Sequence, residues 1–215
     1  MTTKAWKGNP LAPSRFQDCQ GRFVSPVKAL SLARAVVSTL RWKITGHRPE
    51  LPWLNYTAIW RLSKIISPDF RALEFGSGFS TLWFARRCGQ LISVEDDAAW
   101  HRIVAAQLVA AGLSHVDYRH RSEADYCSLA DIPEKSQHLV IVDGSRRNDC
   151  ARLALEKARP GGYVFLDNSD SPFESHREAK ALLLKAADPR CRWIDLDFCP
   201  CLVQVQESVL VRLPD

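Results

Sequence analysis

Two glycines in one short loop form the first candidate binding site in this sequence. Gly76 and Gly78 lie in the stretch E-F-G-S-G-F-S-T, between an apolar run and a helical pattern. Glycine permits a tight turn and a close approach of a ligand, and a helix N-terminus offers unpaired N–H groups to a carboxylate or phosphate. Thr81 stands where a dinucleotide-binding motif has its third glycine, which disfavours NAD. Glu74 instead indicates a ligand that carries a cationic or amine group near the turn.

A second carboxylate follows the next apolar run. Glu95 comes after the helical pattern that follows Gly78, and Asp96 and Asp97 follow it directly. An acid at the end of the second strand of an open parallel sheet accepts hydrogen bonds from ribose hydroxyls. The sequence leaves open which of these carboxylates does so. A tight turn beside a solvated acidic loop, with no ligand, is the structural alternative.

Three more oxygen-bearing side chains follow two later apolar runs. Asp143 closes H-L-V-I-V-D, and Asp167 and Asn168 close the next run. Adjacent parallel strands would bring all three to the sheet edge that carries the glycine turn. Carboxylate and amide oxygens suit Mg²⁺ or Ca²⁺, so Asp143, Asp167 and Asn168 are candidate metal ligands. A metal-free polar site, or strand-end residues that only cap loops, remain the alternatives.

Alternating strand and helix patterns must position these residues. Strands alternating with helices of about 10–15 residues predict an α/β fold with a doubly wound, mostly parallel sheet. The helices are expected at Pro26–Trp42, Asn55–Ile66, Thr81–Cys88, Ala98–Ala111, Asn148–Ala158 and Glu174–Ala187. The strands are expected at Arg71–Phe75, Leu91–Glu95, Val116–His120, His138–Asp143, Tyr163–Leu166, Trp193–Phe198 and Val209–Leu213, with a loop at Cys199–Ser208 between the last two.

These motifs resemble those of class I S-adenosylmethionine-dependent methyltransferases. The likeness rests on E-F-G-S-G-F-S-T and S-V-E-D-D, with P-W-L-N-Y before them and V-D-G-S-R-R and P-G-G-Y-V-F-L-D-N-S after. It implies a Rossmann-like, seven-stranded sheet with an antiparallel C-terminal strand. It also implies that the glycine turn holds the methionine part of S-adenosylmethionine and that the acid after the second strand holds the ribose. The implied cofactor-binding residues are Glu74, Gly76, Ser77, Gly78, Ser80, Glu95 and Asp96.

The later carboxylates are similar to those of the metal-dependent catechol-type O-methyltransferases. In those enzymes an Asp and a later Asp-Asn pair bind a divalent ion, which lowers the pKa of a substrate hydroxyl. Arg146 stands here in place of their lysine base, and arginine stays protonated in proteins. Without a metal, Asp143 is expected to serve as the catalytic base. Arg146, with the adjacent Arg147, is expected to clamp an anionic substrate or stabilise an alkoxide, and Mg²⁺ is a candidate second cofactor.

The positive charge of the chain is concentrated at its N-terminus. Residues 1–50 carry nine Lys/Arg and two acids, whereas residues 51–215 carry 20 bases and 22 acids. We expect residues 1–50 to form a loose basic arm (1–25) and an amphipathic helix, and residues 51–215 to form the cofactor-binding domain. In that helix the spacing places Leu30, Ala33, Val36, Val37 and Leu40 toward the core, and Lys28, Ser31, Arg34, Ser38 and Arg41 on a solvated face.

Composition narrows the class and location of the protein. The chain is 46% apolar and 25% charged, which is typical of a globular protein. No apolar run reaches the roughly 18 residues of a membrane span, and no secretory segment begins the chain. Seven scattered cysteines indicate reduced thiols, so we expect a cytoplasmic protein. The basic N-terminus is expected to contact a membrane surface or a protein partner, and the oligomeric state stays open.

The expected function is an S-adenosylmethionine-dependent methyltransferase that methylates an oxygen of a small-molecule acceptor. The alternative is an inactive methyltransferase-like binding or scaffold protein. A nucleic-acid methyltransferase is disfavoured because the chain has no aromatic-plus-proline tetrapeptide such as N-P-P-Y, and Asp167-Asn168-Ser169-Asp170 is the nearest stretch.

Overall fold

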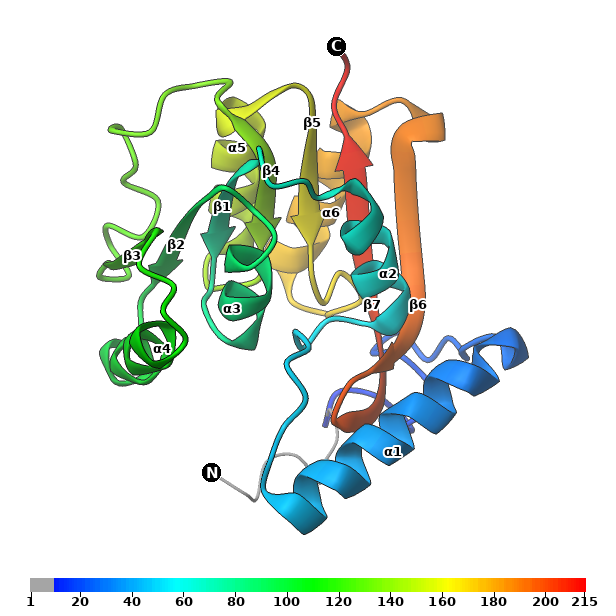
Figure 1. Ribbon diagram of the computed structural model, residues 1–215. Coiled ribbons are helices and arrows are strands. Elements are labelled where there is room, and N and C mark those ends of the chain that lie inside the picture. The colour runs from blue at the N-terminus through cyan, green and yellow to red at the C-terminus, as the bar shows by residue number, and fades with distance from the viewer. Residues whose placement is uncertain (1–9) are drawn as a thin grey trace.

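A seven-stranded sheet runs through the protein in the order β3-β2-β1-β4-β5-β7-β6 (Figure 1). The structure, a computed structural model, describes residues 10–215. Neighbouring strands from β3 to β5 are parallel, and β7 is antiparallel to both β5 and β6. The predicted doubly wound sheet with an antiparallel C-terminal strand is therefore confirmed. The strands are β1 (Arg71–Phe75), β2 (Gln90–Glu95), β3 (Val116–His120), β4 (Gln137–Val142), β5 (Ala158–Leu166), β6 (Arg192–Cys199) and β7 (Leu202–Arg212).

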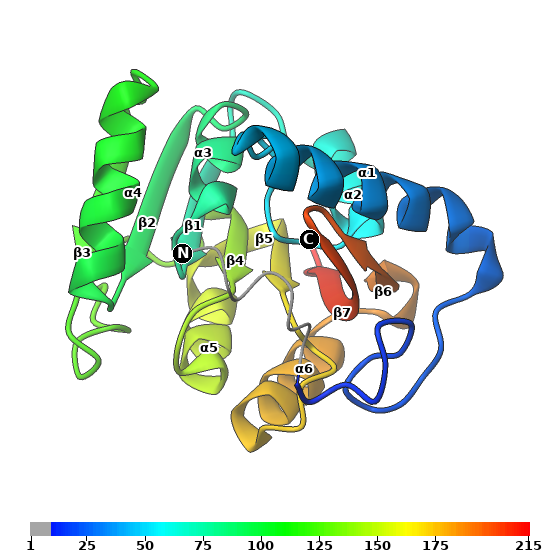
Figure 2. The same cartoon turned by 90° about the horizontal axis from the view of Figure 1, so that it is seen from below.

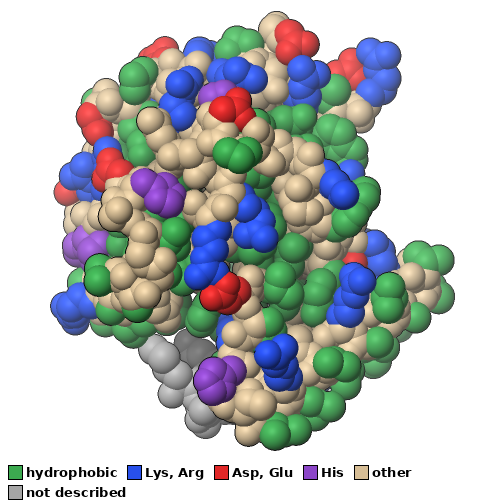
Figure 3. Space-filling view, viewed as in Figure 1, with side chains coloured by type: hydrophobic (Ala, Val, Ile, Leu, Met, Phe, Trp, Pro, Cys, Tyr) green, Lys and Arg blue, Asp and Glu red, His purple; other side chains and the backbone are tan. Residues whose placement is uncertain are grey.

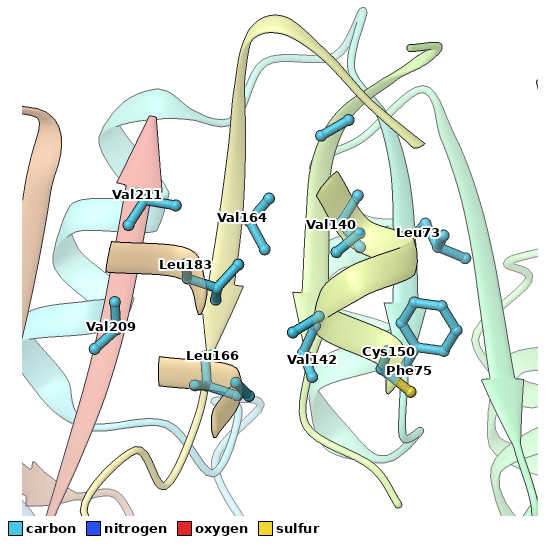
Figure 4. Close-up of a cluster of buried hydrophobic side chains, with 14 of the residues drawn as sticks. Leu73, Phe75, Val140, Val142, Cys150, Val164, Leu166, Leu183, Val209 and Val211 are labelled. Carbon is cyan, nitrogen blue, oxygen red and sulfur yellow. The ribbon is translucent and has the colours of Figure 1, made fainter. Parts of the chain in front are cut away.

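Helices cover both faces of the sheet, with α2 and α3 on one side and α5 and α6 on the other (Figure 2). Side chains of β4 alternate between these layers: Val140 and Val142 join the core under α5 and α6 (Figure 4), whereas Leu139 and Ile141 join the core under α2 and α3. No helix within residues 10–215 is long and apolar enough to cross a membrane. The helices are α1 (Ala29–Thr45), α2 (Tyr56–Ile65), α3 (Phe79–Ala85), α4 (Ala98–Ala110), α5 (Arg147–Lys157) and α6 (Glu174–Ala186), with short 3₁₀ turns at Pro26–Lys28 and Pro189–Cys191.

The C-terminal hairpin is longer than the sequence pattern predicts. The expected loop Cys199–Ser208 is wrong, because β7 begins at Leu202 and pairs with β6 up to Cys199. Only Pro200 and Cys201 connect the strands, and Cys201 has a φ of +59°. The prediction failed because β7 carries buried polar residues, which interrupt its apolar pattern: Gln204, Gln206, Glu207 and Ser208.

Residues 10–25 pack against the body of the protein and are not the loose arm that the sequence predicts. Asp18 is fully buried and accepts a hydrogen bond from Nε of Arg22 at 2.7 Å. The same guanidinium contacts Glu207 of β7 at 2.6 Å, and the N–H of Cys19 donates to Asp170 at 2.9 Å. The bonds of Arg22 to Glu207 and of Cys19 to Asp170 join residues more than 150 positions apart, so no local pattern could reveal them. Residues 1–9 of the expected arm lie outside the described residues.

Helix α1 packs with the face opposite to the predicted one. Ser31 donates to Asp197 of β6 at 3.0 Å, and Ser38 accepts from the N–H of Cys201 at 2.9 Å. The hairpin thus offers polar groups to α1, and the small, hydroxyl-bearing face of the helix satisfies them. The apolar residues that the pattern assigns to the core are instead largely exposed: Leu30 is 64%, Val36 37%, Val37 65% and Leu40 49% exposed.

Candidate active site

The loop between β1 and α3 contains a glycine that the backbone requires. Gly76 has a φ of +88°, and its N–H donates to the carbonyl of Val94 in β2 at 2.9 Å. A Cβ at this position would lie 2.5 Å from the backbone nitrogen of Gly144, in the loop after β4. The positive φ and this backbone contact both exclude a side chain. Gly76 therefore allows the loops after β1 and β4 to meet.

The second glycine of the loop has a different role. Gly78 is extended, with a φ of 168°, and a Cβ there would meet only Trp100, at 3.9 Å. Its N–H donates to Oγ1 of Thr81 at 2.9 Å, and that hydroxyl donates to Glu74 at 2.7 Å. Helix α3 begins at the next residue, Phe79. The fold therefore does not need glycine at position 78, and its missing side chain leaves space beside the helix N-terminus.

Glu74 is a fully buried carboxyl group under the glycine turn. Its Oε2 accepts hydrogen bonds from Thr81 at 2.7 Å and from Ser93 at 2.6 Å. Within residues 10–215 its Oε1 has no hydrogen-bond partner. Burial raises the pKa of Glu74 to about 7, against the hydroxyls of Ser93, Thr81 and Ser80, which lower it. Buried polar atoms are rarely left unpaired, so Oε1 is a ready acceptor for an N–H group of a ligand.

The raised pKa of Glu74 predicts a pH-dependent stability. Between its ordinary value of 4.5 and about 7 the folded protein holds a proton that the unfolded chain releases, so stability falls as pH rises through this range. Glutamine does not ionise. We expect the free energy of unfolding of Glu74→Gln, relative to wild type, to increase by about 3 kcal/mol from pH 4.5 to pH 8. Urea denaturation at both pH values measures this, with the exposed Glu174→Gln as the control. A difference that does not vary with pH would contradict the prediction.

Glu95 is oriented at the end of β2 by four hydrogen bonds. Oε2 accepts from the N–H of Ser77 at 3.0 Å and from its hydroxyl at 2.6 Å. Oε1 accepts from the N–H groups of Asp96 at 3.1 Å and Asp97 at 3.0 Å. Asp96 thus contributes its backbone to the position of Glu95, and the carboxyl of Asp97 caps α4 by accepting from Ala99 at 2.8 Å. Of the three consecutive acids, Glu95 is the one fixed against the glycine turn.

The structure also brings Asp143, Asp167 and Asn168 together at the ends of β4 and β5. They line a cavity of about 180 Å³, and Gln206 of β7 donates to both carboxyl oxygens of Asp167 at 3.1 Å. Burial raises the pKa of Asp143 to about 6, an effect that Arg147 opposes. Burial and the neighbouring Asp143 also raise the pKa of Asp167. The other residues that line the cavity are Trp53, Cys199 and Leu202.

The guanidinium of Arg147 lies among the three predicted metal ligands. Its Nη2 donates to Oδ1 of Asp143 at 2.9 Å and to Oδ1 of Asn168 at 3.2 Å, and its Nη1 donates to the backbone carbonyl of Asp167. Across residues 10–215, no three His, Cys, Asp or Glu side chains are placed to hold a metal ion. A positive charge fixed by the chain lies where Mg²⁺ would bind, so these residues do not fit the predicted metal site.

The two adjacent arginines point to different places. Arg146 has a φ of +48°, pairs with Asp149 at 2.8 Å and donates to the carbonyl of Glu123 at 3.0 Å. These contacts hold Arg146 toward the loop before β4, and Arg147 is the arginine that contacts Asp143. No local spacing could show this, because Asp143 precedes α5 and Arg146, the N-cap of the helix, has a left-handed backbone.

A third arginine, which sequence reasoning missed, lies beside the glycine turn. The guanidinium carbon of Arg48 is 3.8 Å from the ring centre of Phe79 and 4.3 Å from that of Trp53. Its Nη2 donates to the carbonyl of Leu51 at 3.4 Å, and the guanidinium also interacts with the side chain of Cys201. Burial lowers its pKa to about 10. Trp53 also lines the cavity of Asp143, so this stack closes the site on the side of α2.

Solved structures share this arrangement of strands and helices. The O-methyltransferase TomG from Streptomyces achromogenes, involved in tomaymycin synthesis and solved with S-adenosylmethionine, has a TM-score of 0.61 at 20% identity, over 86% of this chain and 90% of its own. The O-methyltransferase from Bacillus cereus, in complex with S-adenosylhomocysteine (SAH), has a TM-score of 0.60 at 14% identity, over 85% and 99%. The chain has the class I methyltransferase fold.

The methyltransferase fold alone does not identify the acceptor. An rRNA methylase from Streptococcus thermophilus has it as well, with a TM-score of 0.52 at 10% identity, over 72% of this chain and 92% of its own. No protein-family model matches the sequence, and neither does any curated protein. The function must therefore be argued from the site.

Proposed function

We propose that this protein is an S-adenosylmethionine-dependent methyltransferase that acts on an oxygen of a small-molecule acceptor. The observation that carries the proposal is the pair of buried carboxylates on either side of the glycine turn. Glu95 is fixed by four hydrogen bonds, and Glu74 keeps one oxygen unpartnered within the described chain. The O-methyltransferases of similar fold, solved with S-adenosylmethionine or SAH, support this function.

The residues of the glycine turn fit the cofactor in three respects. The open space at Gly78 and the N–H groups at the start of α3 suit its methionine part. In this proposal a ribose hydroxyl replaces the hydroxyl of Ser77 on Glu95, since that hydroxyl can bond Tyr118 at 2.6 Å instead, and Oε1 of Glu74 accepts from an N–H group. When bound, S-adenosylmethionine supplies a methyl group already activated on a sulfonium.

The cavity of Asp143 suits the oxygen of an acceptor. With a pKa of about 6, Asp143 is largely ionised at neutral pH and basic enough to take the proton of an acceptor hydroxyl. Arg147 is 2.9 Å from this carboxylate, and its charge stabilises the oxygen anion that forms as the proton leaves. The fixed guanidinium takes over the electrostatic role that the sequence assigned to Mg²⁺. A cavity of about 180 Å³ admits the hydroxyl-bearing end of a small molecule.

Calorimetric titration with SAH tests the proposed function. We expect wild-type protein to bind SAH with micromolar affinity and Glu95→Ala to bind it at least tenfold more weakly, because each lost ribose hydrogen bond costs about 1 kcal/mol and the turn loses its anchor. Asp188→Ala removes an exposed carboxyl group at the opposite end of the strands and serves as the control. The absence of any wild-type binding at millimolar SAH would rule out the proposal.

We also propose a cytoplasmic location. The proposal rests on the seven scattered cysteines, whose spacing is typical of reduced thiols in a reducing compartment.

A further inference from the structure

The outward face of α1 carries a continuous apolar stripe. Leu30, Ala33, Val37, Leu40 and Ile44 follow one another at steps of three and four residues, which places them on one side of the helix. This side lies opposite the face that packs on β6 and β7. Leu30, Val37 and Ile44 are 64%, 65% and 81% exposed. Figure 3 shows hydrophobic side chains gathered along α1 at the lower edge of the molecule. Such a stripe needs a partner, because monomeric proteins rarely leave it uncovered.

An apolar groove extends this stripe toward α2. The groove has a volume of about 540 Å³, and Ala33 and Val37 of the stripe line one wall. Ile59 and Trp60 of α2 line the opposite wall, and Trp60 is 58% exposed. A tryptophan at the rim of an apolar surface is typical of proteins that lie at a membrane interface. The stripe and the groove together make one surface, the α1–α2 face.

The charges that line the α1–α2 face are basic, and the acid beside the groove, Glu50, is paired with Arg86. Arg34 and Arg41 of α1 line the groove, and both are exposed. No acidic residue occurs between Asp18 and Glu50. A second copy of the chain would bring these arginines against the same arginines, which is unfavourable. An anionic surface is complementary to the arginines and to the apolar stripe between them.

The α1–α2 face lies at the functional end of the molecule. The parallel strands of the sheet point their carboxyl ends toward the side on which α1 lies (Figure 1). The glycine turn and the cavity of Asp143 are at these carboxyl ends. A surface on which α1 rests would therefore be close to the entrance of the site.

We propose that the α1–α2 face docks the protein on an anionic phospholipid bilayer. Leu30, Val37 and Ile44 enter the acyl boundary of the bilayer, as in helices that lie in the membrane plane. Arg34 and Arg41 contact the lipid phosphates, and the binding weakens as salt screens them. This docking depends on α1 and α2 and does not require the proposed methyltransferase activity.

Flotation with lipid vesicles tests the docking. We expect wild-type protein to bind vesicles that mix phosphatidylcholine and phosphatidylglycerol at about two to one in low salt, and to bind pure phosphatidylcholine at least tenfold more weakly. Arg34→Gln/Arg41→Gln should weaken binding to the anionic vesicles by about thirtyfold, because two basic contacts are lost. Ile44→Asp should also lose binding. Val109→Asp on α4 is the matched control, since Val109 is 81% exposed like Ile44, and it should bind as wild type does.

Two further measurements make the outcome decisive. Each variant should keep the wild-type melting temperature and SAH response, so that lost flotation is not lost folding. Equal loss of flotation in Val109→Asp, or no wild-type flotation with anionic vesicles, would overturn the proposal. A concentration-dependent dimer in sedimentation that Ile44→Asp abolishes would also overturn it, in favour of a second copy as the occupant.

Discussion

Alanine at Gly76 is expected to destabilise the whole protein, whereas alanine at Gly78 is expected to leave its stability nearly unchanged. At Gly76 the new Cβ would lie 2.5 Å from the nitrogen and 2.6 Å from the Cα of Gly144, and φ is +88°. Both atoms belong to backbone, so no side chain can move to relieve the contact. The unfavourable φ costs about 1–2 kcal/mol, and the overpacking adds about 1–3 kcal/mol. At Gly78 the backbone is extended and the nearest atom is an ordinary 3.9 Å away.

Urea denaturation of four proteins separates these effects. Gly112→Ala is the matched control for Gly76→Ala, because Gly112 has a φ of +67° and nothing lies within 4 Å of a Cβ there. Its free energy of unfolding should fall only by the cost of a positive φ for alanine, about 1–2 kcal/mol. Gly76→Ala should lose about 2–5 kcal/mol, and Gly78→Ala less than about 1 kcal/mol. Equal losses in Gly76→Ala and Gly112→Ala would show that the loops after β1 and β4 do not press on each other at Gly76.

Ligand binding then distinguishes what the two glycines do. If the open space at Gly78 receives the methionine part of the cofactor, Gly78→Val should keep its melting temperature and lose at least tenfold in affinity for SAH. This result would place the role of Gly78 in binding and that of Gly76 in folding. Unchanged SAH affinity in Gly78→Val would remove Gly78 from the cofactor-binding residues.

The sequence predicts those parts of the fold that local patterns encode. The bounds of β1 and β3 agree with the structure, since each is a short run between clear turn signals. The glycine loop was recognisable because a strand, a turn and a helix follow one another there. Its electrostatics were also predictable in part: Glu74 and Glu95 lie against the loop because each ends or nearly ends a strand at the same sheet edge.

The errors come from contacts between residues distant in the chain. Gln206 is buried in β7 because it donates to Asp167, and Ser31 of α1 faces the protein because it donates to Asp197. Hydropathy assigns both positions to solvent, since polar residues are usually exposed. Whether such a residue is buried depends on a partner that a one-dimensional pattern does not contain. The same reason explains why α1 exposes its apolar side.

The predicted metal ligands do not suit Mg²⁺ for a related reason. The three oxygen-bearing residues are brought together as expected, and their chemistry alone suits Mg²⁺. The sequence does not show that α5 begins at Arg147 and turns that side chain inward while Arg146, with a φ of +48°, turns outward. Whether a guanidinium fills the site therefore depends on which of two adjacent arginines the start of α5 turns inward.

Removing Arg147 is expected to have the second large effect. Arg147 is 6% exposed, and its loss leaves the carboxylate of Asp143, whose side chain is 23% exposed, without its cation. Breaking a fully buried pair costs about 3–5 kcal/mol, and the partial exposure of Asp143 reduces this to about 2–3 kcal/mol. We expect Arg147→Met to lose this much stability at pH 8 in urea denaturation. Arg146→Met should lose less than about 1 kcal/mol, because the exposed pair with Asp149 contributes little.

The pH dependence of this loss identifies its cause. Without Arg147 the pKa of Asp143 should rise above its wild-type value of about 6, because the guanidinium is the group that opposes the effect of burial. At pH 5 the carboxyl of the variant is then protonated and uncharged, so the loss relative to wild type should be smaller than at pH 8. A loss of equal size at both pH values would indicate that only packing was removed.

A double variant tests whether the pair acts as a unit. Asp143→Asn removes the negative charge, so Asp143→Asn/Arg147→Met should be more stable at pH 8 than Arg147→Met alone, which is a coupling that independent sites do not show.

The role of Arg147 as the cation of the site also predicts that the melting temperature and SAH affinity of the wild type are unchanged by millimolar Mg²⁺ or by EDTA. Stabilisation of the wild type by Mg²⁺ would contradict the role of Arg147 as the cation of the site. It would also require Arg147 to move away from Asp143 and Asn168, because a guanidinium and a divalent ion cannot share the same oxygens at these distances.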